Sequence, residues 1–157
     1  MKIISLNITF VFTLALLFLV SACQQAPKEQ SADWSTSTGE VRPGPKTGKA
    51  VLALLSKARQ ASNAGSLAAA ESHLERALRI EPRNPTLWLY MAKLRLYAEK
   101  SKEAINLAKK ALALSSSGRE HESLRADCWR VIAYAYQKQG NLEQARIAED
   151  KAKSISD

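Results

Sequence analysis

The chain has 157 residues, which is enough for one folded domain, and its composition is ordinary for a helical protein apart from its charge. Its 23 basic residues outnumber its 15 acidic residues, so the formal net charge is +8. Because the only histidines, His73 and His121, lie far apart in the sequence, a three-ligand zinc site or a histidine-activated nucleophile is not expected.

The first 22 residues have the pattern of a secretion signal. Lys2 precedes a mostly apolar run over residues 3–20, and the small residues Ser21 and Ala22 follow. Cys23 comes directly after them, an arrangement that resembles the lipobox of bacterial lipoproteins. The resemblance implies cleavage before Cys23, attachment of diacylglycerol to its sulfur, and acylation of the new amino terminus. Two alternatives stay open, namely an uncleaved transmembrane anchor and an unmodified Cys23 after ordinary cleavage.

Lipidation of Cys23 would decide where the protein is held. Two or more acyl chains, at about 0.8 kcal/mol per buried methylene, anchor a protein stably to a membrane that it does not span. Gln24 follows Cys23, whereas Asp at this position commonly retains Gram-negative lipoproteins in the inner membrane. The resemblance therefore implies a protein of the outer membrane that faces the periplasm. Cys128 is then left without an intramolecular partner, and we expect it to be packed inside the fold.

A polar stretch follows over residues 24–46. It is rich in Gln, Ser, Thr, Pro and Gly and has almost no apolar residues except Trp34, so it cannot bury enough surface to offset the entropy of ordering. We expect a flexible tether with a root-mean-square span of roughly 25 to 29 Å. The predicted organisation is a signal peptide over 1–22, the lipidated Cys and linker over 23–46, and a folded domain over 47–157.

The folded part is predicted to be all α-helical. Apolar residues recur at steps of three and four throughout, turn residues separate the segments, and no segment alternates like a strand. The expected helices are 48–63, 67–80, 85–99, 102–115, 118–139 and 142–155.

Three copies of one pattern run through these helices. The copies begin at Val51, Pro85 and Ala126, and the first two place small residues at equivalent positions, such as Ala58 and Ala92. Small side chains let paired helices approach closely. A period near 34 residues with such positions is typical of stacked helical hairpins.

This pattern resembles the tetratricopeptide repeat. The match includes Trp88 and Trp129 at position 4 of the motif, Tyr136 at position 11 and Pro82 at position 32, whereas Arg95 replaces the Tyr of position 11 in the second copy. The resemblance implies a right-handed α-solenoid of three helix-turn-helix repeats. The whole sequence is similar to the small periplasmic adaptor lipoproteins of Gram-negative bacteria that contain such repeats.

The third copy begins seven residues later than the period requires. One interpretation starts the fifth helix at Gly118, which adds two turns to its amino end, and the other places the surplus in a loop around residues 115–118. Ser117 with Glu120 resembles a capping box at such a helix start, as does Asn141 with Gln144 before the last helix. At the end of the chain, Glu149 stands at a position that is apolar in the motif. We interpret it as part of a polar outer face that caps the stack.

The resemblance also implies a partner-binding groove, because the first helix of each hairpin lines a concave surface in this family. The groove positions give a mixture of basic, aromatic and aliphatic residues that suits a peptide with acids and an apolar anchor. The family's carboxylate clamp is not expected, since Arg59 and Lys93 stand where it has asparagines. The predicted groove residues are Leu55, Arg59, Leu89, Lys93, Leu96, Tyr97, Arg130, Tyr134, Gln137 and Lys138.

The resemblance implies a lipid-anchored adaptor for proteins of the cell envelope, such as peptidoglycan machinery. The alternative is a structural binder of anionic envelope polymer or lipid, because residues 41–70 contain basic but no acidic side chains. Nucleic acid is a poor candidate partner outside the cytoplasm.

An enzyme, a metal site and a cofactor are not expected: residues 44–49 lack the spacing of a phosphate-binding loop, and residues 121–125 lack the second ligand of a zinc protease helix. The partner's identity and the oligomeric state stay open.

Overall fold

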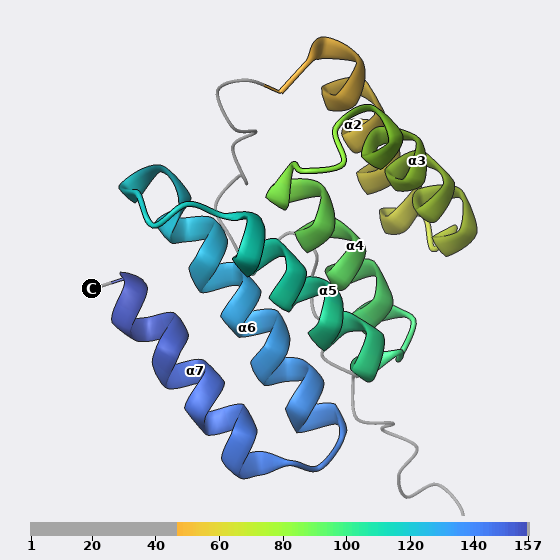
Figure 1. Cartoon of the computed structure of the whole chain (residues 1–157). Coiled ribbons are helices and arrows are strands. Elements are labelled where there is room, and N and C mark those ends of the chain that lie inside the picture. The colour runs from red at the N-terminus through yellow and green to blue at the C-terminus, as the bar shows by residue number, and fades with distance from the viewer. Residues whose placement is uncertain (1–46, 157) are drawn as a thin grey trace, which may run out of the picture. The chain divides into compact units, whose positions relative to one another are not determined.

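The structure is a computed structural model that describes residues 47–156, which Figure 1 shows in colour. The predicted signal peptide, the lipidation of Cys23 and the linker lie outside the described residues. All the described helices belong to one compact unit.

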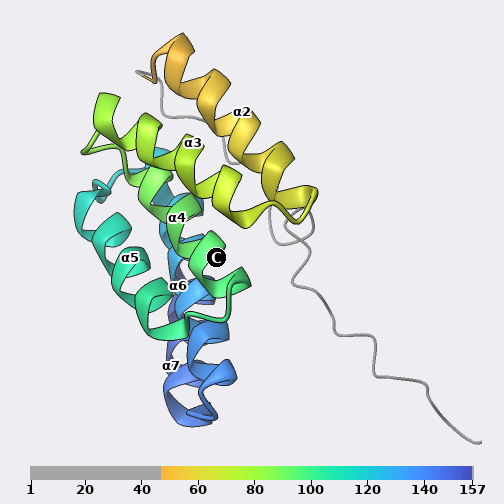
Figure 2. The ribbon, with the colours of Figure 1, turned by 90° about the vertical axis from the view of Figure 1, so that its right-hand side faces the viewer.

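Six α-helices follow one another, as the sequence predicts. They pair into three antiparallel hairpins, and each hairpin also packs on the next (Figure 1 and Figure 2). The described residues contain no strand. The helices are α2 (Lys49–Asn63), α3 (Leu67–Ile80), α4 (Pro85–Tyr97), α5 (Ser101–Leu114), α6 (Glu122–Lys138) and α7 (Leu142–Ser156).

The same local bonding closes the first helix of every hairpin. The residues after α2, α4 and α6, namely Gly65, Glu99 and Gly140, have positive φ values of 75°, 61° and 74°. In each turn the next amide reaches back to the last helical turn, as in the 2.8 Å bond from the Ser66 N–H to the Ala61 carbonyl. The Gly65 N–H also donates to the Ser62 carbonyl, at 2.9 Å. This pair of bonds is a Schellman motif, in which glycine is favoured because it adopts positive φ without strain. Glu99 occupies the equivalent position without that freedom.

Side chains and proline fix the start of the second hairpin. The Asn84 side chain accepts a hydrogen bond of 3.0 Å from the Thr86 N–H, and Pro85 is the first residue of α4. Both are favoured at a helix start, because the cap satisfies a free amide and proline has no amide to satisfy. At the third hairpin, the Asn141 side chain accepts a bond of 3.4 Å from the Gln144 N–H, which is half of the predicted capping box.

The prediction that the fifth helix starts at Gly118 is wrong. Residues 115–118 form a bend, a single 3-10 turn, η2 (Arg119–His121), follows, and α6 begins only at Glu122. The predicted box between Ser117 and Glu120 does not form, and the Ser116 hydroxyl instead lies 2.7 Å from His121 Nδ1. Because nothing caps a helix at Gly118, the seven extra residues are divided between loop, 3-10 turn and one additional turn of α6.

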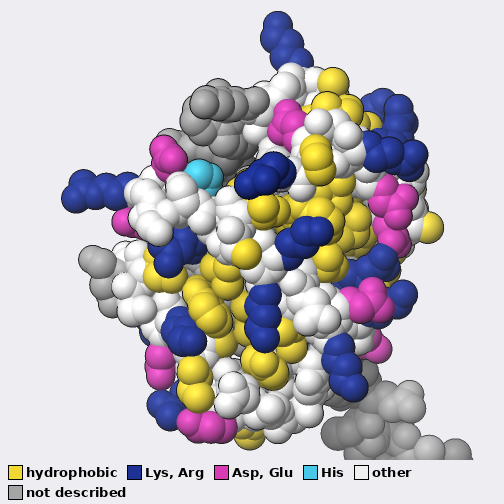
Figure 3. Space-filling view, viewed as in Figure 1, with side chains coloured by type: hydrophobic (Ala, Val, Ile, Leu, Met, Phe, Trp, Pro, Cys, Tyr) yellow, Lys and Arg dark blue, Asp and Glu magenta, His cyan; other side chains and the backbone are white. Residues whose placement is uncertain are grey.

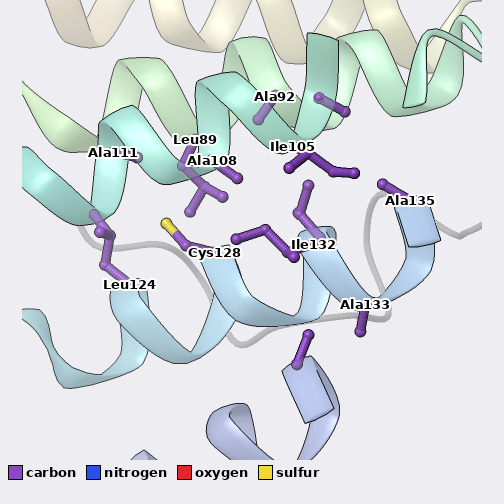
Figure 4. Packing of buried hydrophobic residues seen from close by; sticks show 13 residues of the cluster. Leu89, Ala92, Ile105, Ala108, Ala111, Leu124, Cys128, Ile132, Ala133 and Ala135 are labelled. Carbon is purple, nitrogen blue, oxygen red and sulfur yellow. The ribbon is translucent and has the colours of Figure 1, made fainter. Parts of the chain in front are cut away.

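Alanines fill the contacts between helices, as the repeat pattern predicts. Two clusters of buried residues share Leu107 at their border, and the motif alanines of the first two copies, such as Ala58, Ala70, Ala92 and Ala104, lie inside them. Figure 4 shows one cluster, with Cys128 of α6 pointing toward Leu89 and Ala108. The expected burial of Cys128 is confirmed, and burial raises the pKa of its thiol to about 12, so the thiol stays protonated and unreactive at neutral pH.

The last helix has a charged outer side. Arg146 lies 3.1 Å from Glu143 and 3.3 Å from Asp150, and Lys153 lies 4.0 Å from Glu149. Ala148 and Ala152 of the same helix are buried, whereas Ala145 is half-buried. None of the helices between residues 47 and 156 has the length and apolar character needed to cross a bilayer.

Candidate interaction surface

The predicted groove residues divide into buried and accessible sets. Leu55 and Leu89 belong to the hydrophobic core, and Leu89 is fully buried, so they support the surface from beneath. Lys93, Leu96 and Arg130 are half-buried. The others are exposed. We call the accessible residues of α2, α4 and α6 the first-helix surface: Arg59, Lys93, Leu96, Tyr97, Arg130, Tyr134, Gln137 and Lys138.

Two aromatic side chains give this surface its apolar character. Tyr97 near the end of α4 is 45% exposed, and Tyr134 of α6 is 47% exposed. Exposed tyrosine rings suit contact with a partner, because each offers a large apolar face together with a polar hydroxyl.

A buried carboxylate joins two cations of the first-helix surface. Asp127 of α6 is 2% exposed, and its Oδ1 accepts a hydrogen bond of 2.9 Å from Arg130 Nη1. Its Oδ2 lies 3.5 Å from Nζ of Lys93, whose side chain is 13% exposed. Since Lys93 is on α4 and the other two are on α6, the cluster connects the second and third repeats.

The electrostatic environment extends to the first repeat. Burial raises the pKa of Asp127 above its usual range, and the attraction of Lys93 and Arg130 opposes that rise. Burial likewise raises the pKa of Tyr90 on α4, with Arg59 of α2 opposing the rise and Asp127 adding to it. Charges from all three first helices therefore act within one neighbourhood.

Sequence reasoning missed Asp127. It treated Lys93 and Arg130 as free cations, whereas both contact this carboxylate. A signal was present, because Asp127 precedes Arg130 by three residues on a predicted helix, a spacing that allows an ion pair.

The first hairpin carries basic side chains that have no acidic partner among the described residues. Two nearby acids are engaged elsewhere: Glu71 pairs with Arg95, and Glu81 accepts bonds from the Gly48 N–H and the Asn84 side chain. Glu75 of α3 is exposed and forms no ion pair with these cations. None of the ion pairs within residues 47–156 contains a cation of α2 or α3. The exposed cations of these helices are Lys49, Lys57, Arg59, Arg76 and Arg79.

Figure 3 shows one face of the domain, on which hydrophobic side chains gather in the middle with Lys and Arg among them. Asp and Glu lie mainly toward the edge of this face. Two cations of the domain cover aromatic rings: Lys110 Nζ lies 3.5 Å from the centre of the Trp88 ring, and Lys151 Nζ lies 4.4 Å from that of Trp129.

Comparison with known proteins agrees with this architecture. Residues 51–94 match a family model described as tetratricopeptide repeat. No curated protein matches the chain. Among solved structures, the chain is similar to the globular C-terminal domain of LpoP from P. aeruginosa, with 38% sequence identity and a TM-score of 0.64, over 68% of this chain and 97% of that one.

A second similar structure is the N-terminal domain of stress-induced protein-1 (STI-1) from C. elegans. Its identity is 23% and its TM-score 0.61, over 68% of this chain and 84% of that chain, so it supports the fold alone. One conclusion follows from the repeated hairpins, the matching family model and the 38% sequence identity over 97% of the LpoP domain. The chain belongs to the tetratricopeptide-repeat family.

Proposed function

We propose that this protein is a lipid-anchored scaffold of the cell envelope that binds a protein partner through the first-helix surface. The observation that carries the proposal is the combination of the Lys93–Asp127–Arg130 cluster with the exposed rings of Tyr97 and Tyr134. Cations next to exposed aromatic rings offer both long-range attraction and apolar contact. The likeness to an LpoP domain supports an interaction role and gives no indication of catalysis.

The partner segment that suits this surface is a peptide with acidic residues and an apolar anchor. Arg59, Arg130 and Lys138 speed its approach through their charge, and the tyrosine rings supply area that is buried on binding. A small number of such anchors dominates the affinity of most interfaces. Binding therefore depends on a few residues of α4 and α6 rather than on the whole basic surface.

The anchoring part of the proposal rests on the sequence around Cys23. Acyl chains on Cys23 would hold the protein at the outer membrane, and residues 24–46 would let the repeats reach partners in the periplasm. Labelling cells with a palmitate analogue tests this directly. The wild-type chain should carry the label and sediment with membranes, whereas Cys23→Ala should lose both properties; an unlabelled wild-type chain contradicts the anchor.

A second candidate function is a structural contact with anionic envelope polymer or lipid. It is favoured by the exposed cations of the first hairpin, such as Lys57 and Arg76, which have no acidic partner among the described residues. Such binding would be largely electrostatic and would weaken steadily with salt.

Capture of partners from envelope extract separates the two candidates. The test variant is Lys93→Gln/Asp127→Asn/Arg130→Gln, which removes two cations together with the carboxylate that they neutralise and so leaves no unpaired buried charge. Lys102→Gln, on the exposed side of α5, changes the net charge by the same amount and is the control. The scaffold predicts a protein that the control retains and the triple variant loses, at unchanged helical circular dichroism. If the captured material contains no protein and the binding falls uniformly with rising salt, the polymer binder is supported instead.

A further inference from the structure

We propose that Asp127 determines the charge selectivity of the first-helix surface, so that the site between Lys93 and Arg130 accepts one carboxylate in preference to a dianionic group such as phosphate. This inference rests on the proposed scaffold function and names the chemistry that its surface recognises. The occupant is a single Glu or Asp side chain of the partner.

Asp127 is a fixed part of the site. It is 2% exposed, and each of its oxygens faces a different cation, Oδ1 toward Arg130 Nη1 and Oδ2 toward Lys93 Nζ. A carboxylate held in this way cannot turn outward to make room for a ligand. Its negative charge therefore remains whether or not a partner is bound.

The charge balance follows from this arrangement. The groups in contact, two cations and one anion, carry a net charge of +1, and the next contact of Arg130, Nη2 with the Ser156 hydroxyl at 3.4 Å, is neutral. Arg59 acts on Tyr90 but is not among the charges that act on Asp127, so it stays outside this balance. One further carboxylate brings the local charge to zero. A dianion would leave a surplus negative charge beside a buried carboxylate, where burial makes uncompensated charge costly.

The donors needed to hold a carboxylate are available. A lysine ammonium has three donor hydrogens and an arginine guanidinium has five, and Asp127 occupies one of each group's directions. Arg130 is 35% exposed, so its guanidinium can be approached from solvent. An incoming carboxylate would thus bridge α4 and α6 on the outer side of the pair that Asp127 bridges from within.

A purely structural role would have a different signature. If Asp127 only tied α4 to α6, its replacement by Asn would lower the melting temperature and would leave the preference among anions unchanged. If it sets selectivity, Asp127→Asn raises the local charge from +1 to +2 and strengthens the binding of dianions more than that of monoanions. An added unit charge a few ångströms away changes affinity by about tenfold.

The experiment titrates the full chain, in a zwitterionic detergent, with acetate or with inorganic phosphate at about pH 8, where phosphate is mostly a dianion. The readout is the nuclear magnetic resonance of the Arg130 side-chain N–H, at constant ionic strength. In the wild type, acetate should shift this signal and phosphate should bind no more tightly than acetate. In Asp127→Asn the affinity for phosphate, relative to that for acetate, should rise about tenfold.

A second variant keeps the test decisive if Asp127→Asn does not fold. Lys93→Gln lowers the local charge to zero and should abolish the acetate-induced shift at Arg130, whereas Lys102→Gln on α5 should leave it intact. No acetate shift in the wild type, or an unchanged phosphate-to-acetate ratio in a folded Asp127→Asn, overturns the inference. Because no partner is needed here, failure of this titration leaves the capture result, and with it the scaffold function, separately decided.

Discussion

At the scale of single residues, Asp127 links stability to pH. Burial holds its pKa above the ordinary value of 3.8 in the folded chain, although Lys93 and Arg130 pull it down. A raised folded pKa means that the folded state binds the proton more tightly than the unfolded state does. The resulting stabilisation is fully present below about pH 3.8 and is lost as the pH rises through the folded pKa.

Thermal unfolding of the wild type and of Asp127→Asn checks this sign. The other carboxyl groups are common to both chains, so the difference between their melting temperatures isolates Asp127. The melting temperature of the wild type minus that of the variant should be greatest near pH 3 to 4 and should fall as the pH rises toward neutrality. A difference that is constant, or that grows in favour of the wild type with rising pH, is inconsistent with the raised pKa.

A substitution at Ala104 tests whether a small side chain is required where paired helices touch. It is fully buried on α5, where a small side chain allows the hairpin to close. Ala104→Leu should reduce the free energy of unfolding by about 1 to 3 kcal/mol, because the extra methylenes overpack the contact. Urea unfolding measures the change. Ala113→Leu, an exposed position of the same helix, is the control and should leave stability nearly unchanged.

At the scale of elements, the turns that close the first helices show where the sequence departs from its own repeat. Gly65 and Gly140 meet the need for positive φ, and Glu99 adopts a φ of 61° at the equivalent place in the second repeat. A left-handed conformation costs a residue with a Cβ atom about 1 to 2 kcal/mol. Replacing such a residue by glycine recovers only part of this energy, because glycine is more flexible in the unfolded chain.

Glu99→Gly should therefore stabilise the protein by about 0.5 to 1 kcal/mol and raise its melting temperature. The matched control is Glu75→Gly, an exposed position inside α3, where glycine should destabilise the helix by about 1 kcal/mol. Gly65→Ala provides the reverse substitution and should be destabilising. Destabilisation by Glu99→Gly would show that the turn is not strained.

At the scale of the whole repeat stack, regular features were predictable from the sequence and irregular ones were not. Periodic alanines and turn residues repeat three times, so several weak signals agree on the same six helices. The insertion before α6 occurs once, and the length of helix that it adds was overestimated, because a possible capping box at Ser117 was given more weight than the bend that forms there. The carboxylate of Asp127 escaped notice because its role depends on Lys93, a residue 34 positions away on another helix.

Arg95 shows how the stack is held together across repeats. It pairs with Glu71 of α3 and, at 3.1 Å, with Glu103 of α5, so that one guanidinium connects three helices. Arg95→Gln should lower the free energy of unfolding by about 1 kcal/mol, since its side chain is largely buried and the pairs are partly shielded from water. Urea denaturation measures it. Arg146→Gln, whose pairs on α7 are exposed, should cause no measurable loss.

The tryptophans that lie beneath Lys110 and Lys151 offer a built-in optical probe. Trp88 and Trp129 belong to the second and third hairpins, and the first hairpin has no indole. In a Trp34→Phe chain, emission comes from these two rings alone and reports the melting of the carboxyl-terminal two-thirds of the stack, while far-ultraviolet ellipticity reports all of it. If the first hairpin frays before the others, the ellipticity curve will fall at lower denaturant than the emission curve, and coincident curves will identify a single cooperative unit.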